Sequence, residues 1–182
     1  MKYLARILLR LMGWKVQGEV PKIDKYIVVS APHTSNLDFV LGALYFLSRG
    51  IKAHFLIKKE LFFFPLGPVL KSLGGIPVNR KDSKNVINEM VCHFKSKKRF
   101  NLVITPEGTR KKNPHWKKGF YHIALESQVP VVPSYFDYKE KRVAIFEPCW
   151  LGDDMEEEII KIKRYFKDVT PRFPDKFSLG KI

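Results

Sequence analysis

The sequence predicts an α/β fold, a single domain with a mixed, mostly parallel sheet flanked by helices. Short runs rich in β-branched residues recur along the chain, and the stretches between them carry apolar residues at helical spacing. Strands that alternate with helices favour parallel pairing and a sheet covered on both faces. A length of 182 residues without an internal repeat or a linker-like tract fits one domain with a real core.

The first predicted strand covers residues 26–29 and ends at a turn that carries His33. A helix over residues 37–47 follows, and Ser35 or Asn36 can cap its first turn. A turn followed directly by a helix returns the first helical residues towards the end of the strand. The polar side chains of this unit are therefore expected to meet.

His33 and Asp38 are the two chemistry-bearing residues of that unit. A carboxylate bonded to Nδ1–H fixes the imidazole tautomer and leaves Nε2 free to take a proton from a hydroxyl. The chain has no G-x-S-x-G elbow, so that hydroxyl would come from a substrate. On spacing alone the plain alternative stays open, namely a surface histidine and a favourable acid in the first helical turn.

The remaining elements follow from the same periodicities and from their breakers. Strands are expected over 53–57, 76–78, 101–105, 129–138 and 141–146, and helices from Asp82 or Ser83 through Phe94, over 119–127 and over 153–168. The tail from Thr170 onward is expected to be partly loose.

Residues 61–75 (LFFFPLGPVLKSLGG) form an unusual apolar segment. Pro65, Gly67 and Pro68 make it a poor core helix. Two interpretations stay open: contact with lipid or a roof over a pocket for an acyl chain, or a buried irregular connection.

The net charge of +15 predicts attraction to polyanions such as nucleic acid, anionic lipid or phosphorylated metabolites. Cys92 and Cys149 do not make a disulfide framework and suit a reducing compartment. Cys92 lies beside His93 without a second pair of ligands, so no zinc site is expected.

Residues 1–16 are expected to form an amphipathic helix ahead of a domain over 17–182. Lys2, Arg6 and Arg10 align on one face of that helix, and no small-residue cleavage site follows. An uninterrupted apolar run of about twenty residues, as a membrane span requires, is missing. The helix either lies in a membrane interface or packs on its own domain.

Four motifs occur in a fixed order, each placed by the predicted strands at a strand end, where α/β sheets bind ligands. They are HTSNLD at 33–38, GGIPVNR at 74–80, PEGTR at 106–110 and VPVVP at 129–133. This series resembles the PlsC-type glycerolipid acyltransferases, the family that includes 1-acyl-glycerol-3-phosphate acyltransferase. The resemblance covers residues 25–135.

The resemblance implies acyl transfer from a thioester, acyl-CoA or acyl carrier protein, to a hydroxyl of a lysophosphatidic acid-like glycerolipid. It implies that His33 is the general base and that Asp38 orients it. Its implied substrate-binding residues are Arg80, Glu107, Gly108, Thr109 and Arg110, with the arginines on the acceptor phosphate. Glu107 would position these groups or the acceptor glycerol. No metal or tightly held cofactor is implied, because the thioester is a co-substrate.

Two departures from the family pattern qualify the expectation. Pro77 stands where the family more often has a bulky apolar residue in the second motif. The membrane-binding portion is shorter than in many members, so a cytoplasmic protein with peripheral attachment to an anionic membrane is expected. The expected contacts are the first helix, Phe62–Phe64 and the lysines Lys58, Lys59, Lys117 and Lys118.

Other function classes remain as alternatives. A basic nucleic-acid-binding protein, with patches over 95–99 and 111–118, explains the charge but not the four ordered motifs. A hydrolase would use the same site with water in place of the alcohol. Other open alternatives are an acyltransferase for another lysophospholipid or hydroxyl, and a lipid-binding relative without catalysis.

Overall fold

A computed structural model describes residues 1–182. The strands are β1 (Lys15–Gln17), β2 (Lys25–Ser30), β3 (Ala53–Lys58), β4 (Gly75–Val78), β5 (Phe100–Ile104), β6 (Val131–Asp137) and β7 (Arg142–Ile145). The α-helices are α1 (Lys2–Leu11), α2 (Asn36–Arg49), α3 (Leu66–Ser72), α4 (Ser83–Ser96), α5 (Gly119–Ser127) and α6 (Met155–Arg164), with short 3₁₀ helices at Lys59–Leu61 and Pro174–Lys176.

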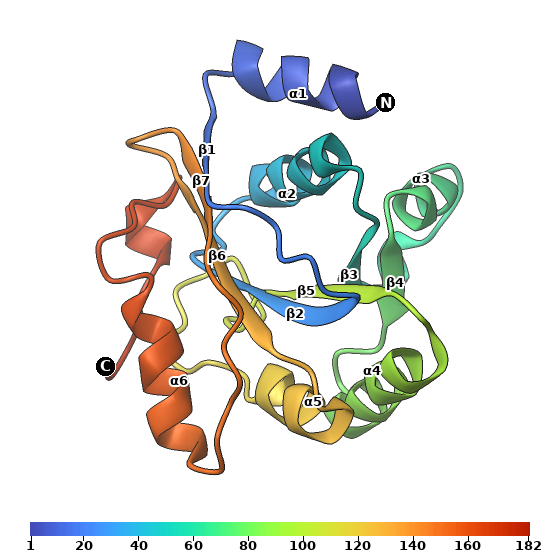
Figure 1. The fold of residues 1–182 in the computed structure, drawn as a ribbon, viewed down its shortest axis with the longest axis vertical. Coiled ribbons are helices and arrows are strands. Elements are labelled where there is room, and N and C mark those ends of the chain that lie inside the picture. Colours follow the sequence, from blue (N-terminus) through green and yellow to red (C-terminus); the bar gives the residue numbers. More distant parts are fainter.

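The strands form one seven-stranded sheet in the order β1-β7-β6-β2-β5-β3-β4 (Figure 1). All pairs from β6 to β4 are parallel, whereas β7 runs antiparallel to β6 and parallel to β1. The predicted mixed, mostly parallel sheet is confirmed. In the register of β2 with β6, Ile27 is opposite Val131 and Ser30 is opposite Ser134, so both strands end at the same edge.

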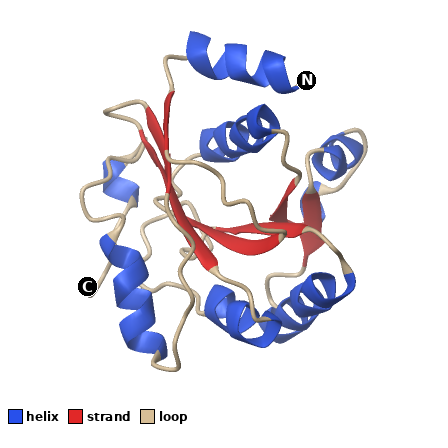
Figure 2. Ribbon diagram, in the orientation of Figure 1, coloured by secondary structure: helices blue, strands red, loops and turns tan.

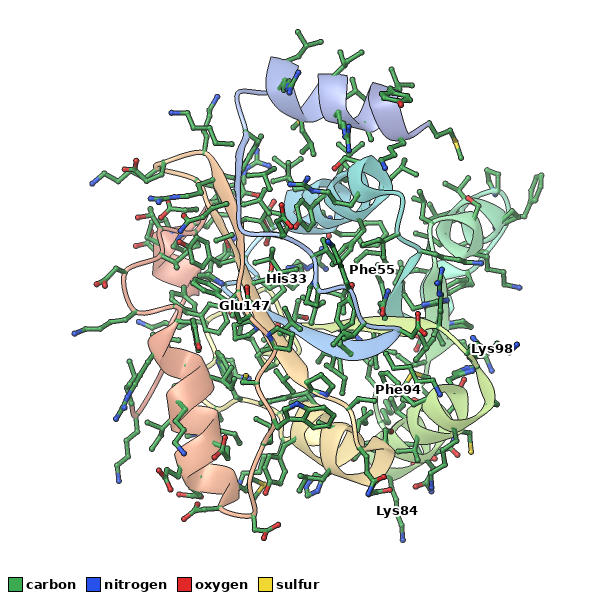
Figure 3. The ribbon with its side chains drawn as sticks, in the orientation of Figure 1. His33, Phe55, Lys84, Phe94, Lys98 and Glu147 are labelled. Atoms are coloured by element: carbon green, nitrogen blue, oxygen red, sulfur yellow. The ribbon has the colours of Figure 1, made fainter.

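Helices cover both faces of the sheet, which gives a three-layer arrangement (Figure 2). Helices α1, α2 and α3 lie on one side of the sheet, with α4 and α5 on the other. Each side has its own apolar core; Phe55 belongs to the first and Phe94 to the second. Figure 3 shows these two side chains on opposite sides of the sheet. Strands buried on both faces explain the continuous apolar runs of β2 and β6 in the sequence.

Two expectations about elements need correction. The edge strand β1 was not predicted, because it has three exposed residues and so carries no burial pattern. The last helix, α6, is shorter than the predicted 153–168. Asp154 caps it by accepting the amides of Glu156 and Glu157, and regular helix ends at Arg164.

The segment 61–75 contains the short surface helix α3. Pro68 is tolerated because it lies in the first helical turn, where its missing N–H has no partner to lose. The interpretation as a buried connection is wrong, since six large apolar side chains are exposed: Leu61, Phe63, Phe64, Leu66, Val69 and Leu73. Contact with lipid stays a prediction.

Helix α1 packs on α2 through its buried residues Ala5 and Leu9. The Nε–H of Arg6 donates to the carbonyl of Ser48 at 3.0 Å, near the C-terminal end of α2, where a cation is favourable. Of the two alternatives left open for this helix, packing on its own domain is observed, and contact with a membrane interface stays a prediction. The opposite side of α1 leaves apolar residues exposed: Tyr3, Leu4, Ile7, Leu8 and Leu11. None of the helices is both long and apolar enough to cross a bilayer.

Candidate active site

The site begins where β2 ends and α2 starts. Ser35 has extended backbone angles and caps α2, with its Oγ accepting the amide of Leu37 at 3.1 Å. Asp38 is the third helical residue, and its side chain completes the capping box. The cap therefore turns the Asp38 carboxylate back over the loop that carries His33.

The predicted contact between His33 and Asp38 is confirmed. Nδ1 of His33 lies 3.1 Å from Oδ2 of Asp38, and the Asp38 side chain is 6% exposed against 20% for His33. The amides of Thr34 and Ser35 also donate to Oδ2, each at 2.9 Å. The Tyr138 hydroxyl donates to the other oxygen, Oδ1, at 2.5 Å. The carboxylate is thus fixed in place, and Nε2 of His33, which has no hydrogen-bond partner, is free to accept a proton.

Glu107 is a second buried carboxyl group beside the histidine. Its Oε1 accepts the amide of His33 at 3.0 Å, Oε2 has no partner, and the residue is 4% exposed. Burial raises its pKa to about 7, against the opposing effect of the His33 amide. Glu107 therefore holds the His33 backbone, and the structure brings its carboxyl to that loop rather than to either arginine.

Arg80 and Arg110 lie next to each other at the same edge of the sheet. Arg80 donates to the carbonyls of Gly108 (3.3 Å) and Leu56 (3.4 Å), while Arg110 donates to the side-chain oxygen of Asn36. Burial and the nearby Arg110 lower the pKa of Arg80 below its usual range. Neither guanidinium forms an ion pair with a carboxylate. Two adjacent cations without a counter-ion make a site suited to a phosphate.

Gly108 and Thr109 form the turn between Glu107 and Arg110. Gly108 has φ +64°, and a Cβ there would come within 2.7 Å of the Lys117 side chain, so only glycine fits without a shift. The Thr109 hydroxyl accepts the amide of Lys111 at 3.2 Å. The turn places the carbonyl of Gly108 where Arg80 donates to it, which joins two of the predicted residues.

The fourth motif, residues 129–133, does not lie where the sequence predicted. Val131 begins β6 and is opposite Ile27, so the motif starts at the sheet edge opposite to His33. Val131 and Val132 are fully buried, and the segment fills the core. The carboxyl end of β6 contributes Tyr138 to the site instead.

Sequence reasoning missed Tyr138, Asn36 and the segment after Thr170. The rule that ligands bind at strand ends, applied to β6, could have found Tyr138. The expected loose tail is wrong at its beginning: the carbonyl of Thr170 accepts the Tyr138 amide at 2.8 Å, and the Phe173 amide donates to the Thr34 hydroxyl at 3.3 Å. No pattern in the sequence signals these tail contacts. No group of three or more histidine, cysteine, aspartate or glutamate side chains could hold a metal ion.

Comparisons with known proteins find a matching family and several similar chains. The family described as Acyltransferase matches residues 14–137. A 1-acyl-sn-glycerol-3-phosphate acyltransferase from Cocos nucifera is 34% identical over 163 residues, which are 79% of this chain and 51% of that protein. The human enzyme 1-acyl-sn-glycerol-3-phosphate acyltransferase beta is 34% identical over 129 residues, 63% of this chain and 45% of its own. The chain thus spans about half the length of such curated relatives.

A solved structure with the same fold is the crystal structure of the 1-acyl-sn-glycerophosphate (LPA) acyltransferase PlsC from Thermotoga maritima. The TM-score is 0.65 at 23% sequence identity, over 91% of this chain and 75% of that one. This likeness supports the α/β architecture described above.

Proposed function

The chain belongs to the family of PlsC-type glycerolipid acyltransferases, and from this premise we propose that it moves a fatty acyl group from a thioester to the free hydroxyl of a lysophosphatidic acid-like glycerolipid. One observation carries the proposal. A histidine whose Nδ1 is held by Asp38 and whose Nε2 is free lies beside the turn after Glu107, and two arginines without an ion-pair partner bond to that turn and to the start of α2. A base without a nucleophile of its own needs a substrate hydroxyl, and the arginines suit a substrate with a phosphate.

In the proposed reaction Nε2 of His33 takes the proton from the acceptor hydroxyl as its oxygen attacks the thioester carbonyl. The imidazolium that forms is stabilised by Asp38, which keeps its negative charge throughout. Collapse of the tetrahedral intermediate breaks the carbon–sulfur bond. His33 returns the proton to the leaving thiolate, so no covalent enzyme intermediate is needed.

Arg80 and Arg110 would hold the acceptor phosphate, with Gly108 and Thr109 shaping the turn between them. Glu107 would keep the His33 loop in place. Binding the phosphate also positions the hydroxyl against Nε2, and orientation of this kind can contribute roughly 7 kcal/mol or more when well aligned. The amides of His33, Thr34 and Ser35 already donate to carboxyl oxygens, so they are not available for the oxyanion.

The proposal includes a cytoplasmic protein bound to the surface of an anionic membrane, because its lipid substrates reside there. The exposed apolar faces of α1 and α3 lie on the same side of the sheet (Figure 1). Lys58 and Lys59 precede α3 and Lys71 lies in its last turn, and these lysines add attraction to anionic lipid. The acyl donor is acyl-CoA or acyl carrier protein, and no tightly held cofactor takes part.

An acceptor panel tests the proposal. Thiol release from palmitoyl-CoA is measured with lysophosphatidic acid, with monoacylglycerol and without acceptor, in the presence of anionic vesicles and then with acyl carrier protein as donor. We expect release that depends on lysophosphatidic acid and is weaker with the phosphate-free monoacylglycerol. Equal release without acceptor would indicate a hydrolase. No release from either donor with any acceptor would contradict acyl transfer.

A further inference from the structure

Tyr138 contacts the candidate catalytic pair from a part of the chain that none of the motifs covers. It follows the carboxyl end of β6, and its hydroxyl lies 2.5 Å from Oδ1 of Asp38. The two residues are 100 positions apart in the sequence, so only the pairing of β6 with β2 brings them together. The hydroxyl can have no other acceptor while it makes this bond, since it has a single proton.

The Asp38 carboxyl has two oxygens with different partners. Oδ2 receives the amides of Thr34 and Ser35 and faces Nδ1 of His33, whereas Oδ1 receives Tyr138 alone. Asp38 is 6% exposed, so without Tyr138 its Oδ1 would be a buried acceptor with no protein partner. Such an oxygen favours rotation of the carboxyl or entry of water, and either change weakens the hold on His33.

The ring of Tyr138 is itself held in place. Trp14 meets it edge to face, with ring centroids 5.1 Å apart at 89°, and meets Phe136 in the same manner at 6.1 Å. The Tyr138 amide donates to the carbonyl of Thr170. Trp14 follows α1 directly and is buried, so the end of that helix is braced against the residue that contacts Asp38.

We propose that Tyr138 is a positioning residue for the reaction, which fixes the Asp38 carboxyl and through it the His33 imidazole, and that Trp14 braces Tyr138 for this task. The inference rests on the proposed function, because it assigns a role within the same site. Burial, followed by the hydrogen bond to Asp38 and its charge, raises the pKa of Tyr138. The hydroxyl therefore stays a donor at every pH at which the protein would work.

The effect on the histidine follows from the geometry. Without the Tyr138 hydroxyl, Oδ1 of Asp38 has no donor and the carboxyl can rotate away from Nδ1 of His33. Tyr138→Phe should then let the His33 imidazole populate both tautomers. It should also lower kcat about tenfold with little change in either KM, because substrate contacts are untouched.

The test compares Tyr138→Phe with Tyr135→Phe in the full chain. Tyr135 lies in β6, three residues before Tyr138, and its hydroxyl makes no hydrogen bond to the protein, so it is a matched control. The nitrogen NMR shifts of the His33 ring, which report the tautomer, give a readout without substrate, and kcat with each KM is measured beside it. Trp14→Phe should give a smaller change in kcat in the same direction, and Tyr135→Phe none.

A Tyr138→Phe protein with the native His33 ring-nitrogen shifts and native kcat would overturn the inference while leaving acyl transfer intact. If the native protein transfers no acyl group, the proposed function fails. The ring-nitrogen shifts still decide whether Tyr138 acts on His33.

Discussion

At the scale of single residues, the site contains two buried carboxyl groups with opposite surroundings. Asp38 has hydrogen-bond donors on both oxygens, as an ionised group requires. Glu107 has one donor, from the His33 amide, and an orphan oxygen. Burial without enough donors favours the protonated form, which is why the pKa of Glu107 rises to about 7.

Glu107 predicts a specific dependence of stability on pH. Its pKa is about 7 in the folded protein and near 4.5 when unfolded, so the native state binds the extra proton between these values. Its contribution to the free energy of unfolding therefore falls as pH rises from 4.5 to 7, by up to about 3 kcal/mol. The free energy of unfolding, measured by denaturation at pH 5 and at pH 8, should fall less between these two pH values in Glu107→Gln than in the native chain. Equal losses would contradict a buried, protonated Glu107.

We expect the loss of Arg110 to change KM for the acceptor and not KM for the acyl donor. It contacts Asn36 and lies beside Arg80, but it does not touch His33 or Asp38. Arg110→Gln should raise KM for lysophosphatidic acid about tenfold, the cost of one charge-assisted contact at an exposed site, and leave KM for the acyl donor unchanged. Steady-state kinetics with each substrate varied in turn checks this. Lys112→Gln is a control that removes a nearby exposed charge.

At the scale of elements, α1 and α3 each bury only two residues and leave most of their apolar side chains exposed. The turn just before α3 exposes Phe64 at 86% and Phe63 at 58%, which no packing requirement within the domain explains. The sequence signalled this segment by its composition. It could not show on which side the phenylalanines lie, because they belong to no helix or strand with a period.

We expect the exposed phenylalanines before α3 to determine how strongly the protein binds membranes. Phe63→Ser and Phe64→Ser should each weaken binding to anionic vesicles about tenfold, since each removes apolar area that could enter the interface. Trp150→Ser is the matched control, because Trp150 is another exposed aromatic residue at 69%. Vesicle sedimentation measures binding, and thermal denaturation checks that the fold is kept. Unchanged binding in both phenylalanine variants would exclude the turn before α3 as a lipid contact.

At the scale of the whole molecule, the sheet order decides which residues meet. His33 and Asp38 could be predicted because they belong to one strand–turn–helix unit. Arg80 and Arg110 could be expected at the same edge because parallel strands end together. Tyr138 and the Thr170 segment could not, because their contacts depend on β6 pairing with β2, which no local pattern encodes. For the same reason the sequence analysis placed residues 129–133 at the end of a strand, whereas in the structure β6 begins within them, at Val131.

The net charge of +15 predicts how attachment responds to salt. The Debye length falls from about 10 Å at 0.1 M salt to about 3 Å at 1 M, so attraction of exposed lysines to anionic lipid should weaken strongly over this range. Sedimentation with anionic vesicles should show this loss of lipid binding. Nucleic acid should bind too weakly to compete with the vesicles for the protein. Vesicle binding that does not change with salt concentration would mean that apolar contact alone attaches the protein.

The central claim is that His33, oriented by Asp38, activates a lipid hydroxyl for attack on a thioester. The most direct measurement is lysophosphatidic acid-dependent thiol release from palmitoyl-CoA by the native chain, by His33→Ala and by Asp38→Asn in anionic vesicles. We predict release by the native chain, loss to background in His33→Ala and a large fall in kcat in Asp38→Asn. Release by a folded His33→Ala protein at the native rate would contradict the account.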